Sequence, residues 1–364
     1  MQFVKTEDLK TGMRLARPIY SKKGVLLFDR NFRLTMQAIE SARNFGLLGI
    51  YVLDPAEPLP PMSEEDLEFE HFQMKEIFSL QEEIEKILSG GKKSRISNIA
   101  DMLLKNFGHV ERKINFYQSL RSREDYVYRH SLNVAILCTL ITHVMNIRLD
   151  EQKHTVCAAL LHDIGRVRMK EDKLDDNDLS TISQLRLLEA QSQANDLIES
   201  AVDGGKSVRR ICMQVLRLQL DMLNGENEAS NAKMTMGAKI LAVANRYDEV
   251  TAMSLSGNAE SEVKALCEFR DNPHIYDPAV VEALISSINI LPPGSCIEMN
   301  TGEKALVLVE NPDDVLKPMV LSFKDNSIVD LSLRVNRDIE IVDIMKTLDN
   351  RYIIDTDTLH RAGY

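Results

Sequence analysis

The apolar residues of the chain follow three different patterns along its length. Residues 13–53 alternate short apolar runs with turn residues around one helical stretch, LTMQAIESARNFG, which predicts a small α/β unit with a hairpin, one helix and a closing strand. Residues 95–290 repeat apolar positions at intervals of three and four, as in SLNVAILCTLITHVM, which predicts a helical domain. After residue 291 the runs KALVLVE, PMVLSFK and SIVDLSL are typical of short strands. We therefore expect a mainly α protein with a small α/β unit before the helices and a β-rich unit after them.

Two proline-rich stretches, PAEPLPP and LPPG, are the natural boundaries between these parts. They favour an N-terminal α/β domain at 1–60, a helical connector at 61–115, a helical domain at 116–290 and a β-rich unit at 291–364. The connector contains an acidic segment with helical periodicity at 64–88. Such a segment is usually a solvated helix, but its apolar stripe also permits a homodimer contact.

The net charge and the cysteine pattern limit the classes of binding partner and the cellular compartment that we expect. The net charge of −11 opposes binding to a nucleic acid polymer or to an anionic membrane, because both favour clustered Lys and Arg. The five cysteines are scattered without CxxC spacing, which fits free thiols in a reducing compartment. The N-terminus lacks the pattern of a secretory signal, and no apolar run approaches the roughly 20 residues of a membrane span. We therefore expect a cytoplasmic protein.

The stretch LLHDIGRVR, residues 160–168, carries the first candidate chemistry. His162 and Asp163 are adjacent and both side chains are good ligands for a divalent ion, while Gly165 is expected to end the helix. His130 lies 32 residues earlier on another predicted helix, so a crossing of the two helices would bring all three to one Mn, Fe or Zn ion. The simpler alternative is a set of buried polar side chains that hydrogen-bond one another.

Three motifs together resemble the HD phosphohydrolase superfamily, and specifically its HD-GYP branch of cyclic di-GMP phosphodiesterases. ALLHDIGR resembles the branch's ALLHDIGK, ILAVANRYDEVTA resembles ILAVADxxDALT, and YDPAVVEAL resembles FDPxVVxAF. The resemblance implies the metal ligands His130, His162, Asp163 and Asn245. It also implies that Arg166 contacts a phosphate, and Asp248, three residues after Asn245 on a similar helix face, is a further ligand-binding candidate.

The departures from that family are equally informative. No histidine lies between His162 and His274, although family members carry a later histidine, a histidine pair and a DGxGYP run in this window. The stretch MQVLRLQLDMLNGEN stands there, so that Leu216 and Arg217 are expected near the histidine positions and Asp221 is the one acidic residue retained. Asn245 also replaces the Asp of the motif, which removes a charge from the site.

These departures predict at most one weakly bound divalent ion and the loss of two-metal phosphodiester hydrolysis. The favoured interpretation is a bacterial-type, cyclic di-GMP-related signalling protein with a degenerate HD-GYP domain that binds a cyclic dinucleotide or a signalling protein. The alternatives are an active phosphohydrolase with a mononuclear site and an oligomeric scaffold that binds no ligand.

Overall fold

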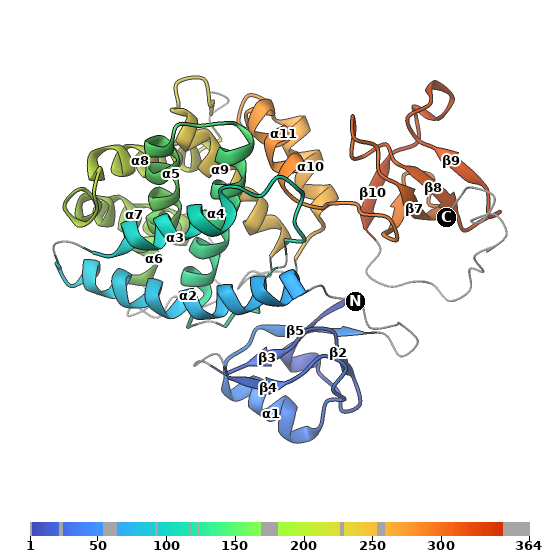
Figure 1. Ribbon diagram of the computed structural model, residues 1–364, viewed down its shortest axis with the longest axis horizontal. Helices are drawn as coiled ribbons and strands as arrows, with labels where there is room; N and C mark the ends of the chain where they lie inside the picture. The colour runs from blue at the N-terminus through green and yellow to red at the C-terminus, as the bar shows by residue number, and fades with distance from the viewer. Residues whose placement is uncertain are drawn as a thin grey trace.

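The fold combines a helical body with a small sheet unit at each end, and Figure 1 shows the N-terminal unit against the long helix α2 and the C-terminal sheet beside α10 and α11. This confirms the predicted fold class. The computed structural model describes residues 2–21, 25–53, 64–91, 94–116, 118, 120–122, 124–168, 181–225, 229–252 and 259–344. The stretch PAEPLPP, on which the first predicted boundary rests, lies outside the described residues.

The N-terminal unit pairs its strands antiparallel in the order β1-β5-β2, with a separate β3-β4 hairpin. Thr35 starts the helix of the unit, because its side chain accepts a hydrogen bond from the backbone NH of Ala38. Leu15, Ile19 and Ile50 are fully buried in a core of the unit's own. The elements are β1 (Gln2–Lys5), β2 (Arg14–Leu15), β3 (Ile19–Tyr20), β4 (Leu26–Phe28), α1 (Met36–Asn44) and β5 (Gly49–Leu53).

The helical body is arranged around α4, in which every residue from Tyr126 to Thr142 is buried. Helices α2, α5, α9 and α11 all pack against it, which explains why apolar residues occur on all of its sides. The helices are α2 (Glu64–Leu88), α3 (Ile96–Phe107), α4 (Tyr126–Val144), α5 (Leu149–Leu161), α6 (Ile164–Arg168), α7 (Thr181–Ala201), α8 (Gly205–Leu223), α9 (Met236–Thr251), α10 (Glu262–Asp271) and α11 (Pro278–Ser287).

The apolar stripe of α2 packs inside this body. Phe69, Ile77, Leu80, Ile84 and Ile87 are all buried in the same hydrophobic core as α4. The stripe is thus used within the chain, and a homodimer through the 64–88 helix stays a prediction.

Gly165 does not end a helix, contrary to the sequence-based expectation. Helix α5 has already ended at Leu161, and Gly165 lies within the short helix α6. A β-carbon at position 165 would come within 2.4 Å of the backbone of Gln191 on α7. The glycine therefore permits a close contact between α6 and α7.

The C-terminal unit is a five-stranded antiparallel sheet in the order β10-β6-β7-β8-β9. Its residues Ile297, Ala305 and Val320 continue the core of the helical body, so the exact domain boundaries stay predictions. The strands are β6 (Cys296–Met299), β7 (Lys304–Val309), β8 (Met319–Ser322), β9 (Ile328–Asp330) and β10 (Ile341–Ile344).

The structure can be compared with the sequence-based expectations for the cysteines and for membrane-spanning segments. All five cysteines are free, and Cys138, Cys157 and Cys212 are buried. In the part of the chain that the structure describes, no helix has both the length and the apolar character that crossing a membrane requires.

Candidate metal centre

Three helices bring four of the predicted site residues to one point. His130 lies on α4, His162 and Asp163 lie between α5 and α6, and Asn245 lies on α9. All four are at most 5% exposed. Within the described ranges, the ligand atoms of His130, His162 and Asp163 all lie within 4.8 Å of one another.

The donor atoms are spaced as ligands of one ion would be. Nε2 of His130 lies 3.2 Å from Nε2 of His162, and Oδ1 of Asn245 lies 2.9 Å and 2.8 Å from these two nitrogens. Oδ2 of Asp163 lies 3.7 Å from Nε2 of His130. Ligands held at about 2.0–2.2 Å from a shared Zn ion lie about 3–4 Å apart, so this spacing fits a metal.

Hydrogen bonds on the outer side of each ring decide which nitrogen faces the centre. Nδ1 of His130 donates to Oδ2 of Asp248 at 2.6 Å, and Nδ1 of His162 donates to the backbone oxygen of Ala159 at 2.8 Å. Each neutral ring therefore directs the lone pair of Nε2 inward, where it meets the amide oxygen of Asn245. Three acceptors that face one another need a cation or a proton between them.

Asp163 contributes the negative charge. Burial opposes ionisation of this carboxyl, but Arg166, His162 and His130 together outweigh burial and hold its pKa below the ordinary value. Nε of Arg166 lies 2.9 Å from Oδ2 of Asp163 as an ion pair, yet Oδ2 is buried and accepts no hydrogen bond of good geometry. This oxygen retains coordinating capacity, and the set of two imidazoles, one carboxylate and one amide fits a divalent ion.

The two histidines differ in their affinity for a proton. At His130, burial disfavours the charged ring, but the hydrogen bond to Asp248 and the negative charges of Asp248 and Asp163 together outweigh burial and raise the pKa. At His162, burial dominates and lowers the pKa. The difference arises because the outer partner of His130 is a carboxylate, whereas that of His162 is a neutral backbone oxygen.

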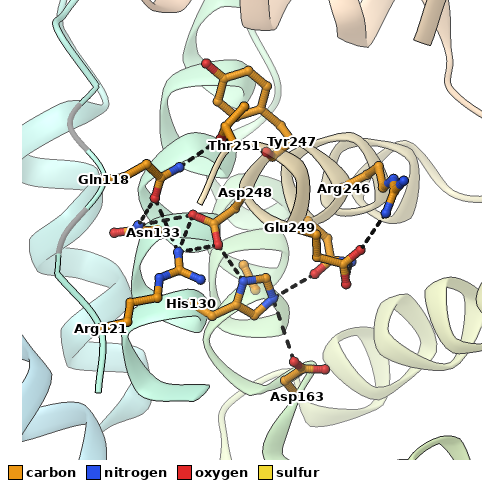
Figure 2. Close-up of polar contacts among 12 residues, drawn as sticks. Gln118, Arg121, His130, Asn133, Asp163, Arg246, Tyr247, Asp248, Glu249 and Thr251 are labelled. Carbon is orange, nitrogen blue, oxygen red and sulfur yellow. Dashed lines mark hydrogen bonds and ion pairs between the residues drawn. The ribbon is translucent and has the colours of Figure 1, made fainter. Parts of the chain in front are cut away.

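Asp248 lies on the far side of His130 from the centre, as Figure 2 shows. It is fully buried, and its two carboxylate oxygens lie 2.8 Å and 2.6 Å from the same guanidinium nitrogen of Arg121. Burial opposes ionisation of Asp248, but Arg121 and His130 outweigh it and lower its pKa. The carboxylate of Asp248 is thus engaged on the Nδ1 side of His130, and a direct role of Asp248 in ligand binding stays a prediction.

A cavity of about 540 Å³ opens beside the centre, bordered by Asn245 and by the predicted phosphate contact Arg166. Arg246 and Glu249 of α9 also border it, and their side chains interact at 3.6 Å. Arg246 in turn forms two hydrogen bonds with Glu268, at 2.7 Å and 2.9 Å. The cationic groups at this cavity are therefore already paired with carboxylates.

The wall that α8 forms along the cavity is mostly apolar, and its lining residues are Val215, Leu218, Gln219, Met222 and Leu223. The two residues expected near the family's histidine positions are placed differently. Leu216 is buried, whereas Arg217 is exposed and pairs with Asp221 on the same helix, and neither borders the cavity.

Sequence reasoning did not identify Arg121 or Glu249 as parts of the site. Arg121 precedes α4 and reaches Asp248 across 127 positions of sequence, so no local pattern points to it. Glu249 accepts a hydrogen bond from Nδ2 of Asn245 at 3.1 Å. Its position four residues after Asn245 on a predicted helix already indicates that the two side chains are neighbours.

Comparisons with known proteins agree with this geometry. The family model described as HD domain matches residues 127–249, the range that contains His130, His162, Asp163, Asn245 and Asp248. The chain is also 23% identical over 217 residues to a cyclic di-GMP phosphodiesterase of Pseudomonas aeruginosa, a match that covers 56% of this chain and 49% of the relative. The chain thus spans about half the length of that relative. No solved structure matches the chain.

The family match confirms the resemblance to HD proteins that the motifs indicated, whereas membership in the HD-GYP branch stays a prediction. Residues 127–249 of this chain thus match an HD domain in sequence.

Proposed function

We propose that this protein is a cyclic di-GMP-related signalling protein whose HD domain holds one divalent ion and binds its nucleotide without turning it over. The convergence of His130, His162, Asp163 and Asn245 at ligand spacing is the observation that carries the proposal. A bound divalent ion supplies Lewis acidity toward a phosphate oxygen. The four donors suit Mn, Fe or Zn.

The nucleotide class is taken from the relative and is compatible with the cavity. Arg166 and Arg246 border the cavity and offer planar guanidinium groups, which suit phosphate oxygens. The rings of Tyr126 and Tyr276 and the apolar side chains of α7 and α8 also line it, and such surfaces suit a base or ribose. A phosphate would have to share each arginine with Asp163, Glu249 or Glu268.

Binding without turnover is proposed because the residues for a second metal are missing. Hydrolysis with a metal pair needs further ligands on the opposite side of the substrate. The sequence has no histidine between His162 and His274, and α8 lines the cavity with Val215, Leu218, Gln219, Met222 and Leu223. One ion can still orient a phosphate, so ligand binding does not require the second site.

A mononuclear phosphohydrolase is the second candidate, and the preserved geometry of the single site favours it over a scaffold without ligand. Both candidates predict a bound metal. They differ in whether a phosphate ester is consumed.

The test combines metal analysis, calorimetry and a turnover assay. We expect protein purified without chelator to bind about one Mn²⁺ or Zn²⁺ per chain, to bind cyclic di-GMP, and to form no linear dinucleotide or GMP above a metal-only control. The variant His162→Ala/Asp163→Ala should lose the metal. Protein-dependent hydrolysis that this variant abolishes would replace the binding proposal by the hydrolase, while absence of metal from the unmodified protein would refute both.

A further inference from the structure

The side-chain amide of Asn245 decides whether the centre is open to a cation. An amide offers an oxygen on one side and two hydrogens on the other. With Oδ1 inward, the amide adds a third acceptor to the two Nε2 lone pairs. With Nδ2 inward, it would donate to those same nitrogens and satisfy them without any metal.

Glu249 is the residue that discriminates between these two orientations. Its Oε1 lies 3.1 Å from Nδ2 of Asn245, and an ionised carboxylate can only accept hydrogen bonds. Glu249 therefore favours Nδ2 outward and Oδ1 inward. Figure 2 shows Glu249 on the same helix as Asp248, between His130 and Arg246.

The carboxylate of Glu249 is itself held in place from two sides. Arg246 lies 3.6 Å from Oε2, and Arg166 lies 4.0 Å from Oε1. The side chain is 26% exposed, so it is partly withdrawn from water at the border of the cavity. Two of the three departures from the motif ILAVADxxDALT lie one helical turn apart, because Asn245 replaces its Asp and Glu249 replaces its Ala.

We propose that Glu249 is a positioning residue that orients the amide of Asn245 for metal coordination and restores, one helical turn away, the negative charge that position 245 lacks. This inference rests on the proposed metal site. The charge acts through the polarised amide, since the N–H···O⁻ hydrogen bond increases the negative partial charge on Oδ1.

We expect removal of the Glu249 carboxylate to weaken metal binding when residue 245 is Asn and to strengthen metal binding when residue 245 is Asp. Glu249→Ala should weaken Mn²⁺ binding about tenfold to a hundredfold, the equivalent of one lost hydrogen bond to a charged group. Glu249→Gln should weaken it less, because the Gln oxygen can still accept from Nδ2 and only the charge is lost. In the Asn245→Asp background, Glu249→Ala should instead strengthen binding, since it removes a carboxylate facing a carboxylate.

The experiment is calorimetric titration of Mn²⁺ into the full chain and its single and double variants. Glu268→Ala is the matched control, because it removes another carboxylate that pairs with Arg246, whereas the Nδ2 group of Asn245 donates to Glu249. This variant should change affinity less than twofold. Equal affinities of Glu249→Ala and unmodified protein would overturn the proposal. So would an equal loss in both backgrounds, which would indicate only a general effect of charge.

A second measurement tests the orientation without any metal. In metal-free protein at pH 8, the ¹⁵N shifts of the two Nε2 atoms should change in Glu249→Ala toward those of hydrogen-bonded acceptors, as the amide turns its NH₂ group inward. Unchanged shifts would contradict the orienting role even if metal binds. Lack of metal binding by unmodified protein together with the expected shifts would instead refute the proposed function alone.

Discussion

At the scale of single residues, the metal affinity of the centre is limited by the small number of negative charges among its ligands. Of the four proposed ligands, Asp163 is the one that carries a full negative charge, because both histidines coordinate as neutral rings and Asn245 is an amide. The nearby charge of Arg166 keeps Asp163 ionised and also competes with a metal for its oxygen. A weakly held ion is the expected result.

Asp163→Asn should therefore lower Mn²⁺ affinity strongly. A charge beside a dication in a partly dehydrated site contributes on the order of 1–3 kcal/mol, which corresponds to about tenfold to a hundredfold in affinity. Calorimetric titration measures the change, with Asp221→Asn on α8 as a control carboxylate that pairs with Arg217. Similar losses in both variants would show that Asp163 is not a ligand.

At the scale of elements, the contact between α6 and α7 holds Asp163 and Arg166 in place. The backbone nitrogen of Gly165 donates to Oε1 of Gln191 at 2.6 Å, and a β-carbon would collide with the α7 backbone. Any displacement of α6 moves the residues on both sides of Gly165.

Gly165→Ala should consequently lower the free energy of unfolding by about 1–3 kcal/mol, the usual cost of overpacking. It should also weaken Mn²⁺ binding, since Asp163 directly precedes α6. Urea denaturation and calorimetry test the two effects, and Ser200→Ala on the exposed side of α7 is expected to change stability by less than about 0.5 kcal/mol. A fully stable Gly165→Ala protein with unchanged affinity would contradict the role of this close contact.

The start of α11 illustrates a pH-dependent contribution outside the site. Asp277 caps the helix by accepting from the backbone NH of Ala279 and pairs with Lys239 at 2.8 Å. Burial opposes its ionisation, but the hydrogen bonds from Lys239 and Ala279 outweigh burial and lower its pKa. A carboxyl with a lowered pKa stabilises the fold above its unfolded-state pKa, and this stabilisation is lost as the pH falls.

Asp277→Ala should thus lower the free energy of unfolding by about 1 kcal/mol at pH 7, as expected for the loss of an N-cap. The difference from unmodified protein should stay constant between pH 8 and 5 and decrease only as the pH falls below about 4, near the pKa of an unperturbed Asp. Urea denaturation across this range measures it. A difference that grows on acidification would have the wrong sign for this explanation.

At the scale of the whole molecule, one short segment connects the N-terminal unit to the metal centre. The backbone oxygen of Arg121 accepts a hydrogen bond from the NH of Leu48 at 3.0 Å, and Leu47 forms a β-bridge with Ser122. The side chain of Arg121 then reaches Asp248, which in turn holds His130. Its guanidinium also lies 5.1 Å from the ring centre of Tyr126, which lines the cavity.

Arg121→Ala should therefore destabilise the fold by about 3–5 kcal/mol, because it leaves the carboxylate of Asp248 buried without its main cation. Arg121→Lys should cost less, since the charge is kept. Urea denaturation tests both variants against Arg217→Ala, whose exposed ion pair is expected to contribute at most about 1 kcal/mol. If Arg121→Ala were no more harmful than Arg217→Ala, the buried pair would not support the site.

The sequence alone determined the fold class, the identity of His130, His162, Asp163 and Asn245 as the proposed ligand set, and the lack of histidines for a second metal. The fold class depends on the periodicity of apolar positions, whereas the ligand set was implied by the resemblance of short motifs to the HD family, and both are local properties of the chain. The tertiary structure alone decided that Asp248 lies behind His130, that Arg121 pairs with it, and that Leu216 and Arg217 do not face the cavity. Helical spacing places Asn245, Asp248 and Glu249 on neighbouring parts of one helix surface, but the crossing of α4 and α9 determines which side of the His130 ring each one meets.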